Sequence, residues 1–192
     1  MHGRILVVRV VALAFLILFP CCGPPKPPKH DCPIKELVID ETSFPPGSTS
    51  RSLLSPLPRA AWASAGRTID HPGGVANHDV YQFKTAERAA QEYRKREQTQ
   101  FAEDEHKGPW TTPAELTYRS PIADQYRVAC GKLRSLRLCI MVAQYEEYFV
   151  LVTSHMSEDG MTYGDFQRVL WAVDEKMSAC LGKPLTPEAA SP

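Results

Sequence analysis

Three apolar runs near the middle of the chain constrain its fold more than any other feature. Residues 126–130 read Y-R-V-A-C, residues 138–143 read L-C-I-M-V-A, and residues 148–152 read Y-F-V-L-V. β-Branched and aromatic residues favour strands, and only short polar connections separate these runs. Both alternate sets of side chains in 138–143 are apolar, which is typical of a strand covered on both faces. We therefore expect residues 116–155 to form antiparallel sheet.

A strand pair and a helix are expected before this sheet. Residues 61–70 and 78–83 have the composition of strands, and the H-P-G-G segment between them would turn the chain. Thr85 can cap a helix over residues 85–105. The apolar face of this helix follows the i, i+3, i+4, i+7 spacing and contains Ala86, Ala89, Ala90, Tyr93 and Phe101.

The final helix has the clearest start and stop signals. Thr162 and Asp165 have the spacing of a capping box, in which each side chain hydrogen-bonds the other residue's backbone N–H. Gly182 suits the end of the helix, and Pro184 prevents its continuation. Its apolar face contains Phe166, Val169, Leu170, Val173, Met177 and Leu181.

These elements predict one domain over residues 32–183. Their order is strand pair, helix, antiparallel sheet and helix, which indicates an α+β fold with a mainly antiparallel sheet and two helices packed on it. A mobile tail over residues 184–192 is expected to follow. The chain has 22 basic and 22 acidic side chains, so no basic excess favours nucleic acid as a partner.

Residues 1–22 have the outline of an export signal. Arg4 and Arg9 precede an apolar run over residues 10–19. At ~1.5 Å per residue, a helix of this length spans about half of a ~30 Å hydrocarbon core. An export signal therefore fits better than a permanent membrane span, and an uncleaved N-terminal anchor helix is the alternative.

Two adjacent cysteines, Cys21 and Cys22, follow the apolar run. The arrangement resembles the bacterial lipoprotein signal, in which a cysteine is lipidated and becomes the first mature residue. Leu18 has the offset from Cys21 that this signal shows, whereas Phe19 and Pro20 depart from its pair of small residues. We expect Cys21, or else Cys22, to carry a fatty acyl chain such as palmitate. This lipid would hold the protein at the extracytoplasmic face of the cell membrane.

Residues 23–31 have the composition of a tether. Proline favours an extended conformation that rises ~3.1 Å per residue. Lys26 and Lys29 would keep the segment hydrated and close to anionic headgroups. The prolines of the tether are at positions 24, 25, 27 and 28.

The four other cysteines form an even set, which in an exported chain suggests two disulfides. They are Cys32, Cys130, Cys139 and Cys180. If Arg134 and Ser135 form the turn of a hairpin, Cys130 lies directly opposite Cys139, within disulfide reach at a non-hydrogen-bonded position. That pairing leaves Cys32 for Cys180, at the apolar face of the final helix.

No common catalytic or phosphate-binding motif occurs in the sequence. His71 and His78, with Asp79, flank the Gly-Gly turn and would form a metal-dependent or hydrolytic site if the hairpin brought them together. Polar residues of an exposed loop are the simpler interpretation, so we expect no metal and no cofactor. Glu146 and Glu147 fall in an expected exposed turn, which offers a paired acid and base too little burial.

Two further groups are candidate ligand-binding residues. Asp124 and Arg127 could hold a polar ligand at the sheet surface, although a salt bridge or solvent exposure is the commoner role of such residues. His155, Met156 and Met161 are soft ligands of the kind that copper prefers. Met161 also has a packing role, because it stands next to the cap of the final helix.

Four segments of the sequence carry a resemblance to known proteins. They are F-P-P-G, H-D-V-Y-Q-F-K-T-A-E-R-A-A-Q-E-Y, E-L-T-Y-R-S-P-I-A-D-Q-Y and H-M-S-E-D-G-M-T-Y. Over most of residues 31–183 the chain resembles a group of uncharacterised bacterial lipoproteins. Its layout is also similar to extracytoplasmic sensor-type domains of bacterial receptor kinases and, more loosely, to the PsbP and Mog1 fold. None of these resemblances implies a catalytic residue.

The expected function is that of a lipid-anchored extracytoplasmic lipoprotein that acts as a non-catalytic binding or sensory module. Its ligand is either a small molecule or another protein of the envelope. One alternative is a small metal-dependent or hydrolytic enzyme that uses the loop of His71, His78 and Asp79. Another is an envelope scaffold that binds a second protein.

Overall fold

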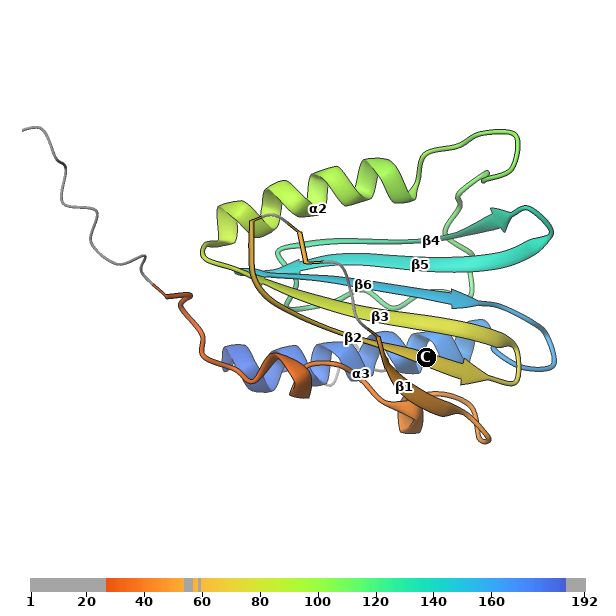
Figure 1. Ribbon diagram of the computed structural model, residues 1–192. Coiled ribbons are helices and arrows are strands. Elements are labelled where there is room, and N and C mark those ends of the chain that lie inside the picture. The colour runs from red at the N-terminus through yellow and green to blue at the C-terminus, as the bar shows by residue number, and fades with distance from the viewer. Residues whose placement is uncertain (1–26, 54–56, 59, 186–192) are drawn as a thin grey trace, which may run out of the picture.

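A six-stranded antiparallel sheet forms the middle layer of the protein (Figure 1). The computed structural model describes residues 27–53, 57–58 and 60–185 of the chain. The strands follow the spatial order β1-β2-β3-β6-β5-β4. They are β1 (Thr49–Leu53), β2 (Ala61–His71), β3 (Gly74–Phe83), β4 (Gln125–Leu133), β5 (Leu136–Tyr145) and β6 (Tyr148–His155).

Two long helices cover the sheet, α2 (Ala86–Gln100) on one face and α3 (Tyr163–Leu181) on the other (Figure 1). Two short 3₁₀ turns, η1 (Ile34–Glu36) and η2 (Glu41–Ser43), precede the sheet. The expected single α+β domain is therefore confirmed. The expected export signal with Cys21 and Cys22, the first part of the expected tether and most of the expected tail lie outside the described residues.

Both helices begin at the residues that the sequence indicates. The Thr85 side chain accepts a hydrogen bond from the Arg88 backbone at the start of α2. Thr162 and Asp165 form the complete capping box of α3, and Gly182 ends that helix in the left-handed conformation with φ of 64°. Helix α2 is shorter than expected. It ends at Gln100, after which the chain turns back and the Trp110 indole donates to the Ala102 carbonyl.

Apolar side chains form two core clusters, one on each face of the sheet. The larger cluster joins the sheet to α3 and to the segments before β1 and β4, and the smaller one joins it to α2. Strand β5 contributes to both, because Met141 faces α3 whereas Val142 faces α2. Residues 139–143 are buried, so the expectation of an interior strand covered on both faces is confirmed.

The structure contains the two disulfides expected from the sequence. Cys130 is the register partner of Cys139 across β4 and β5, and the pair is bonded. Cys32 is bonded to Cys180 with a Cα–Cα distance of 5.8 Å, so the second disulfide joins the start of the domain to the end of α3.

Three elements differ from the expectations. Strand β1 pairs with β2 although its sequence, T-S-R-S-L, lacks a hydrophobic alternation. Strand β3 begins at Gly74 rather than at His78, which makes the β2–β3 hairpin longer. Residues 116–124 form no strand and instead cover the α3 face of the sheet, where Leu116, Tyr118 and Ile122 join the larger core.

Candidate functional site

The chain enters the domain through a cluster of charged residues before β6. The His30 backbone N–H donates to Glu147 Oε1 at 2.7 Å, and His30 Nδ1 lies 3.0 and 3.1 Å from the two oxygens of that carboxylate. Gln82 holds the His30 carbonyl at 2.7 Å. Glu146 is paired with Lys29 at 2.6 Å and with Lys183 at 3.4 Å. This cluster, with the neighbouring Cys32–Cys180 disulfide, fixes the first described residues of the chain to the domain.

Glu147 is only 2 % exposed, so the expectation of two exposed turn carboxylates is wrong for this residue. The N-terminal segment, more than a hundred residues earlier, covers it. Among the described residues, His30, Glu146 and Glu147 are the group whose ligand-type atoms lie close enough together to hold a metal, within 4.8 Å of one another. The lysine that donates to Glu146 lowers the pKa of its carboxyl group. Because both carboxylates already have cationic or hydrogen-bonding partners, the cluster serves as a clamp.

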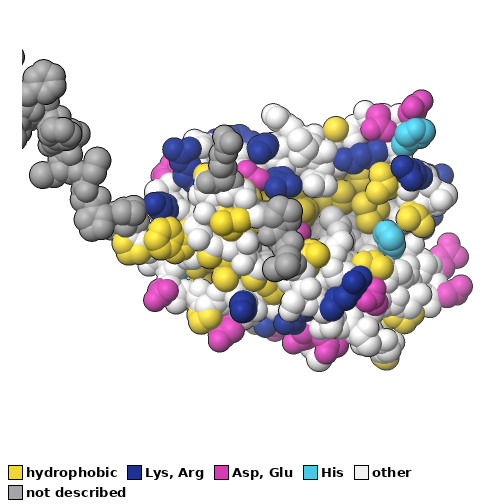
Figure 2. Space-filling view, viewed as in Figure 1, with side chains coloured by type: hydrophobic (Ala, Val, Ile, Leu, Met, Phe, Trp, Pro, Cys, Tyr) yellow, Lys and Arg dark blue, Asp and Glu magenta, His cyan; other side chains and the backbone are white. Residues whose placement is uncertain are grey.

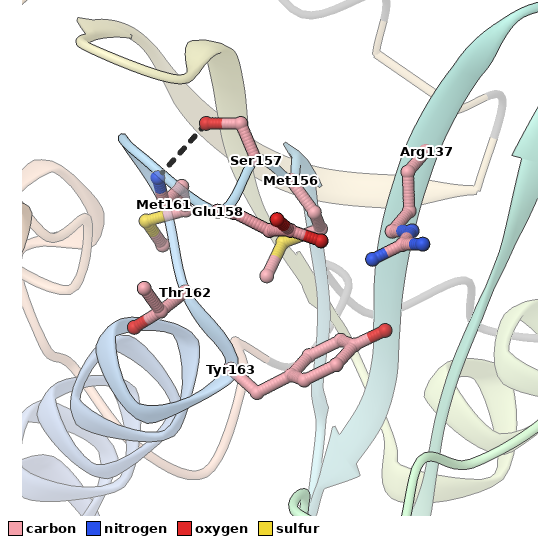
Figure 3. Close-up of a pocket in the computed structure, with 7 residues that line it drawn as sticks. All are labelled: Arg137, Met156, Ser157, Glu158, Met161, Thr162 and Tyr163. Carbon is pink, nitrogen blue, oxygen red and sulfur yellow. Dashed lines mark hydrogen bonds between the residues drawn. The ribbon is translucent and has the colours of Figure 1, made fainter.

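A pocket of about 200 Å³ lies at the opposite end of β6, in the loop that leads to α3 (Figure 3). We call it the loop pocket. Met156 and Met161 form its apolar part, and both are buried. Arg137 reaches it from β5, whereas Glu158 and Tyr163 come from the loop and from the first residue of α3. The remaining lining residues are Ser157 and Thr162.

Close backbone packing holds this loop in place. A Cβ atom on Gly160 would lie 2.3 Å from the Gly73 backbone nitrogen and 2.4 Å from its Cα, so the loop touches the β2–β3 turn. Within the loop, the Ser157 N–H donates to the Met161 carbonyl at 3.1 Å, and Ser157 Oγ accepts from the Met161 N–H at 3.4 Å. The loop that lines the pocket is therefore packed directly against the β2–β3 turn.

Three polar side chains around the loop pocket are not used by the fold. Within residues 27–53, 57–58 and 60–185, no hydrogen bond or ion pair engages the side chains of Arg137, Glu158 and Tyr163. Figure 3 shows the Glu158 carboxylate and the Arg137 guanidinium facing each other across the pocket, with the Tyr163 hydroxyl on the Arg137 side. By contrast, Thr162 caps α3 and Ser157 closes the loop. The pocket therefore combines an apolar wall with available charged groups.

A second depression, of about 710 Å³, lies between the N-terminal segment and α3 beside the Cys32–Cys180 disulfide. Three of its polar side chains have structural partners. Arg67 donates to the Ile39 carbonyl at 3.2 Å, Lys176 donates to the Glu36 carbonyl at 3.1 Å, and Asp40 caps η2. This groove is larger than the loop pocket, but its main cations serve to hold the N-terminal segment.

The expected exposed histidine loop does not exist. His71 and His78 are buried in β2 and β3, and they differ by four positions in strand register, which separates them by about 13 Å at ~3.3 Å per residue. His71 Nε2 lies 3.2 Å from Ser154 Oγ, and His78 Nδ1 accepts from the Ile39 N–H at 3.0 Å. Asp79 follows His78 on the strand and so points to the opposite face. The three residues therefore do not form a common site.

Asp124 and Arg127 also lie apart. Asp124 Oδ2 accepts from the Glu146 N–H at 2.5 Å and takes part in the clamp around the tether. Arg127 pairs with Glu97 of α2 at 3.3 Å, and its guanidinium lies 4.2 Å from the centre of the Phe101 ring. Each has a structural partner on a different side of the sheet, so they do not hold one ligand together.

Two of the three soft ligands noted in the sequence do line a pocket. Met156 and Met161 belong to the loop pocket, but their sulfur atoms are directed to different parts of it in Figure 3. His155 Nδ1 instead accepts a long hydrogen bond, 3.5 Å, from the Val75 N–H. The expected packing role of Met161 is confirmed because the residue is fully buried.

The residues that give the loop pocket its polar character, Arg137, Glu158 and Tyr163, were missed by the sequence analysis. Arg137 belongs to a strand and has no distinguishing neighbour. A signal did exist for Glu158, because S-E-D-G joins a strand to a capped helix, and loops held by rigid elements often carry binding residues.

Large exposed hydrophobic side chains lie at more than one place on the surface, although Leu133 and Leu136 are register partners at the β4–β5 turn. Figure 2 shows hydrophobic side chains gathered beside α2, with basic side chains around them. Leu53 on β1 and Leu133 on β4 lie at opposite edges of the sheet, so the large exposed hydrophobic residues do not form one patch. These residues are Leu53, Leu57, Trp62, Leu133 and Leu136.

The fold defines a disulfide-bonded α+β domain, and the loop pocket is its candidate site. No protein-family model and no curated protein sequence matches this chain. Among the described residues, no helix has the length and apolar character that crossing a membrane requires. The function is therefore inferred from the geometry.

Proposed function

We propose that the protein is a lipid-anchored extracytoplasmic module that binds a small ligand in the loop pocket without catalysing a reaction. The observation that carries this proposal is that the contact of His30 with Glu147 and the loop pocket lie at opposite ends of β6; Figure 1 shows the course of this strand. Glu147 holds His30 just before the strand, and Met156 enters the pocket just after it. Eight strand residues at ~3.3 Å each separate the pocket from the contact of His30 with Glu147 by about 26 Å.

This geometry suits a receptor that samples the space beyond the membrane. An N-terminal lipid anchor would hold the clamped end of the domain near the headgroups. The loop pocket would then face away from the membrane and remain accessible to solutes. The Pro-rich tether adds further distance, since an extended proline segment rises ~3.1 Å per residue.

The chemistry of the pocket supports binding of a small molecule. Ligand sites usually combine apolar walls with a few convergent polar groups that fix orientation. Met156 and Met161 form the apolar wall of the loop pocket, and Arg137 and Glu158 are its charged groups. A volume of about 200 Å³ equals that of about seven water molecules at ~30 Å³ each, so the ligand is small.

The alternatives have less support. An enzyme built on His71, His78 and Asp79 would need these side chains to converge, and their strand positions keep them apart. A scaffold would need one extensive apolar surface, whereas Leu53 and Leu133 lie at opposite edges of the sheet.

Ligand-observed NMR with a library of small polar compounds would test the proposal. The full chain in mild detergent should bind a subset of the compounds, and Glu158→Trp should abolish this binding by filling the pocket. Asp159→Trp is the matched control, because Asp159 is an exposed neighbour in the same loop and does not line the pocket. The proposal is overturned if no compound binds, or if both variants bind every compound as the wild type does.

A further inference from the structure

We infer that the ligand of the loop pocket is a free α-amino acid with a small apolar side chain. This inference rests on the proposed binding function and names the chemical class of the ligand. It follows from which groups of the pocket are available and from how they are arranged.

Arg137 and Glu158 are both exposed, and together they suit a ligand that carries both signs of charge close together. Arg137 offers a planar guanidinium that matches a carboxylate in a bidentate manner. Glu158 faces it across the pocket and offers an acceptor for an ammonium group (Figure 3). The described residues supply no ion partner for either side chain, including each other. A zwitterion placed between them would satisfy both.

The position of Tyr163 is consistent with the same orientation. Its hydroxyl lies on the Arg137 side of the pocket in Figure 3. A phenolic O–H can donate to a carboxylate that the guanidinium already holds. The carboxylate end of the ligand would therefore lie between Arg137 and Tyr163, and the ammonium end would lie at Glu158.

Met156 and Met161 indicate that the ligand also carries an apolar group. Met156 is 8 % exposed and Met161 is fully buried, and both side chains belong to the apolar part of the pocket lining. Thioether side chains are flexible and polarisable and adapt to aliphatic groups of different shapes. An apolar side chain on the ligand would contact this wall.

The size of the pocket favours a free amino acid over a peptide as the ligand. The terminal amine and carboxylate of a peptide are separated by its whole backbone, whereas a single α-carbon joins them in a free amino acid. A pocket of about 200 Å³ suits the second arrangement.

The test measures the affinity of three probes for the wild type and for two protein variants. The method is isothermal titration of the full chain in mild detergent. Valine carries both charges, N-acetylvaline lacks the ammonium, and valinamide lacks the carboxylate. The wild type should bind valine at least about tenfold more tightly than either derivative, because each loses a charge-assisted hydrogen bond.

The variants should discriminate between the two ends of the ligand. Arg137→Gln should weaken valine and N-acetylvaline but leave valinamide unchanged. Glu158→Gln should weaken valine and valinamide but leave N-acetylvaline unchanged. Arg134→Gln and Asp159→Asn are the matched controls, because each removes the same charge from a neighbouring exposed residue. Both should bind valine as the wild type does.

Two results would overturn the inference in distinguishable ways. The amino-acid class is wrong if valine and its two derivatives bind equally. It is also wrong if none of the three binds while Glu158→Trp, but not Asp159→Trp, abolishes the binding of library compounds. In both cases the proposed binding function stands. If neither valine nor any library compound distinguishes Glu158→Trp from Asp159→Trp, the proposed function fails as well.

Discussion

His78 shows how a single buried side chain links the N-terminal segment to the sheet. Its Nδ1 accepts from the Ile39 backbone, which places the ring proton on Nε2, and that atom is buried with no hydrogen-bond partner among the described residues. Burial, with smaller effects of Arg67 and Lys176, lowers the pKa of His78 to about 3. A charged imidazole is therefore incompatible with the folded structure at this position.

We predict that His78 makes the protein sensitive to acid. Between the unfolded pKa of about 6.5 and the folded value, the unfolded chain binds a proton at this residue and the folded chain does not. The free energy of unfolding should therefore fall as the pH drops below about 6.5, by up to about 1.4 kcal/mol per pH unit from this group. Urea unfolding between pH 4 and pH 7 measures this slope.

His78→Gln is the informative variant, because the amide oxygen can still accept from Ile39 but does not titrate. It should show a shallower slope than the wild type over this range. His106→Gln, at an exposed position, should retain the wild-type slope. Equal slopes in the wild type and in His78→Gln would show that the fold tolerates the charged ring.

At the scale of elements, the closed loop between β6 and α3 depends on glycine. We predict that Gly160→Ala destabilises the protein by about 3 kcal/mol or more, because the new Cβ would overlap backbone atoms of Gly73 that no rotamer change can move. Gly164→Ala, four residues later in α3, is the matched control. The nearest atom to its new Cβ would be 3.8 Å away, and alanine favours helices by up to about 1 kcal/mol.

Denaturant unfolding of the two variants tests this prediction, and ligand titration gives a second measurement. Gly160→Ala should also lose binding in the loop pocket, whereas Gly164→Ala should retain it. A Gly160→Ala protein with the stability of the wild type would mean that the loop and the β2–β3 turn are not in close contact.

Elements defined by local signals were predictable from the sequence. The Arg134-Ser135 turn fixed the register of β4 and β5, and hence the Cys130–Cys139 pairing, because the side-chain period of a strand is two. Helix α3 was predictable because its capping box is local. Strand β1 was not, because its polar sequence is stabilised by pairing with β2 rather than by its own pattern.

The candidate site was less predictable because it depends on contacts between distant segments. Glu147 is buried by residues that precede it by more than a hundred positions. The loop pocket forms only where the turn at Gly73 meets Gly160, and Arg137 reaches it from another strand. Met156 and Met161 were noted in the sequence as soft ligands, but the charged partners that define the pocket were not.

At the scale of the whole molecule, the clamp and the Cys32–Cys180 disulfide determine where a membrane anchor would pull. The disulfide joins residues that are 148 positions apart, so it ties the exit of the tether to the end of α3. Lys29 forms an ion pair with Glu146, and the His30 N–H donates a hydrogen bond to Glu147, at the same point. Force on the tether would therefore reach the folded domain at one end, far from the loop pocket.

We predict that lipidation at Cys21 or Cys22 anchors the protein. The wild type, expressed in a bacterial host with radiolabelled palmitate, should incorporate label and sediment with membranes. Cys21→Ser with Cys22→Ser should remove the label and release the protein, because the run over residues 10–19 is too short to span the bilayer as a helix. Cys130→Ala with Cys139→Ala is the matched control, since it also removes two cysteines but should keep both label and membrane binding. If the Cys21 and Cys22 variant stays on the membrane and the wild type is unlabelled, residues 1–22 act as an uncleaved anchor helix instead.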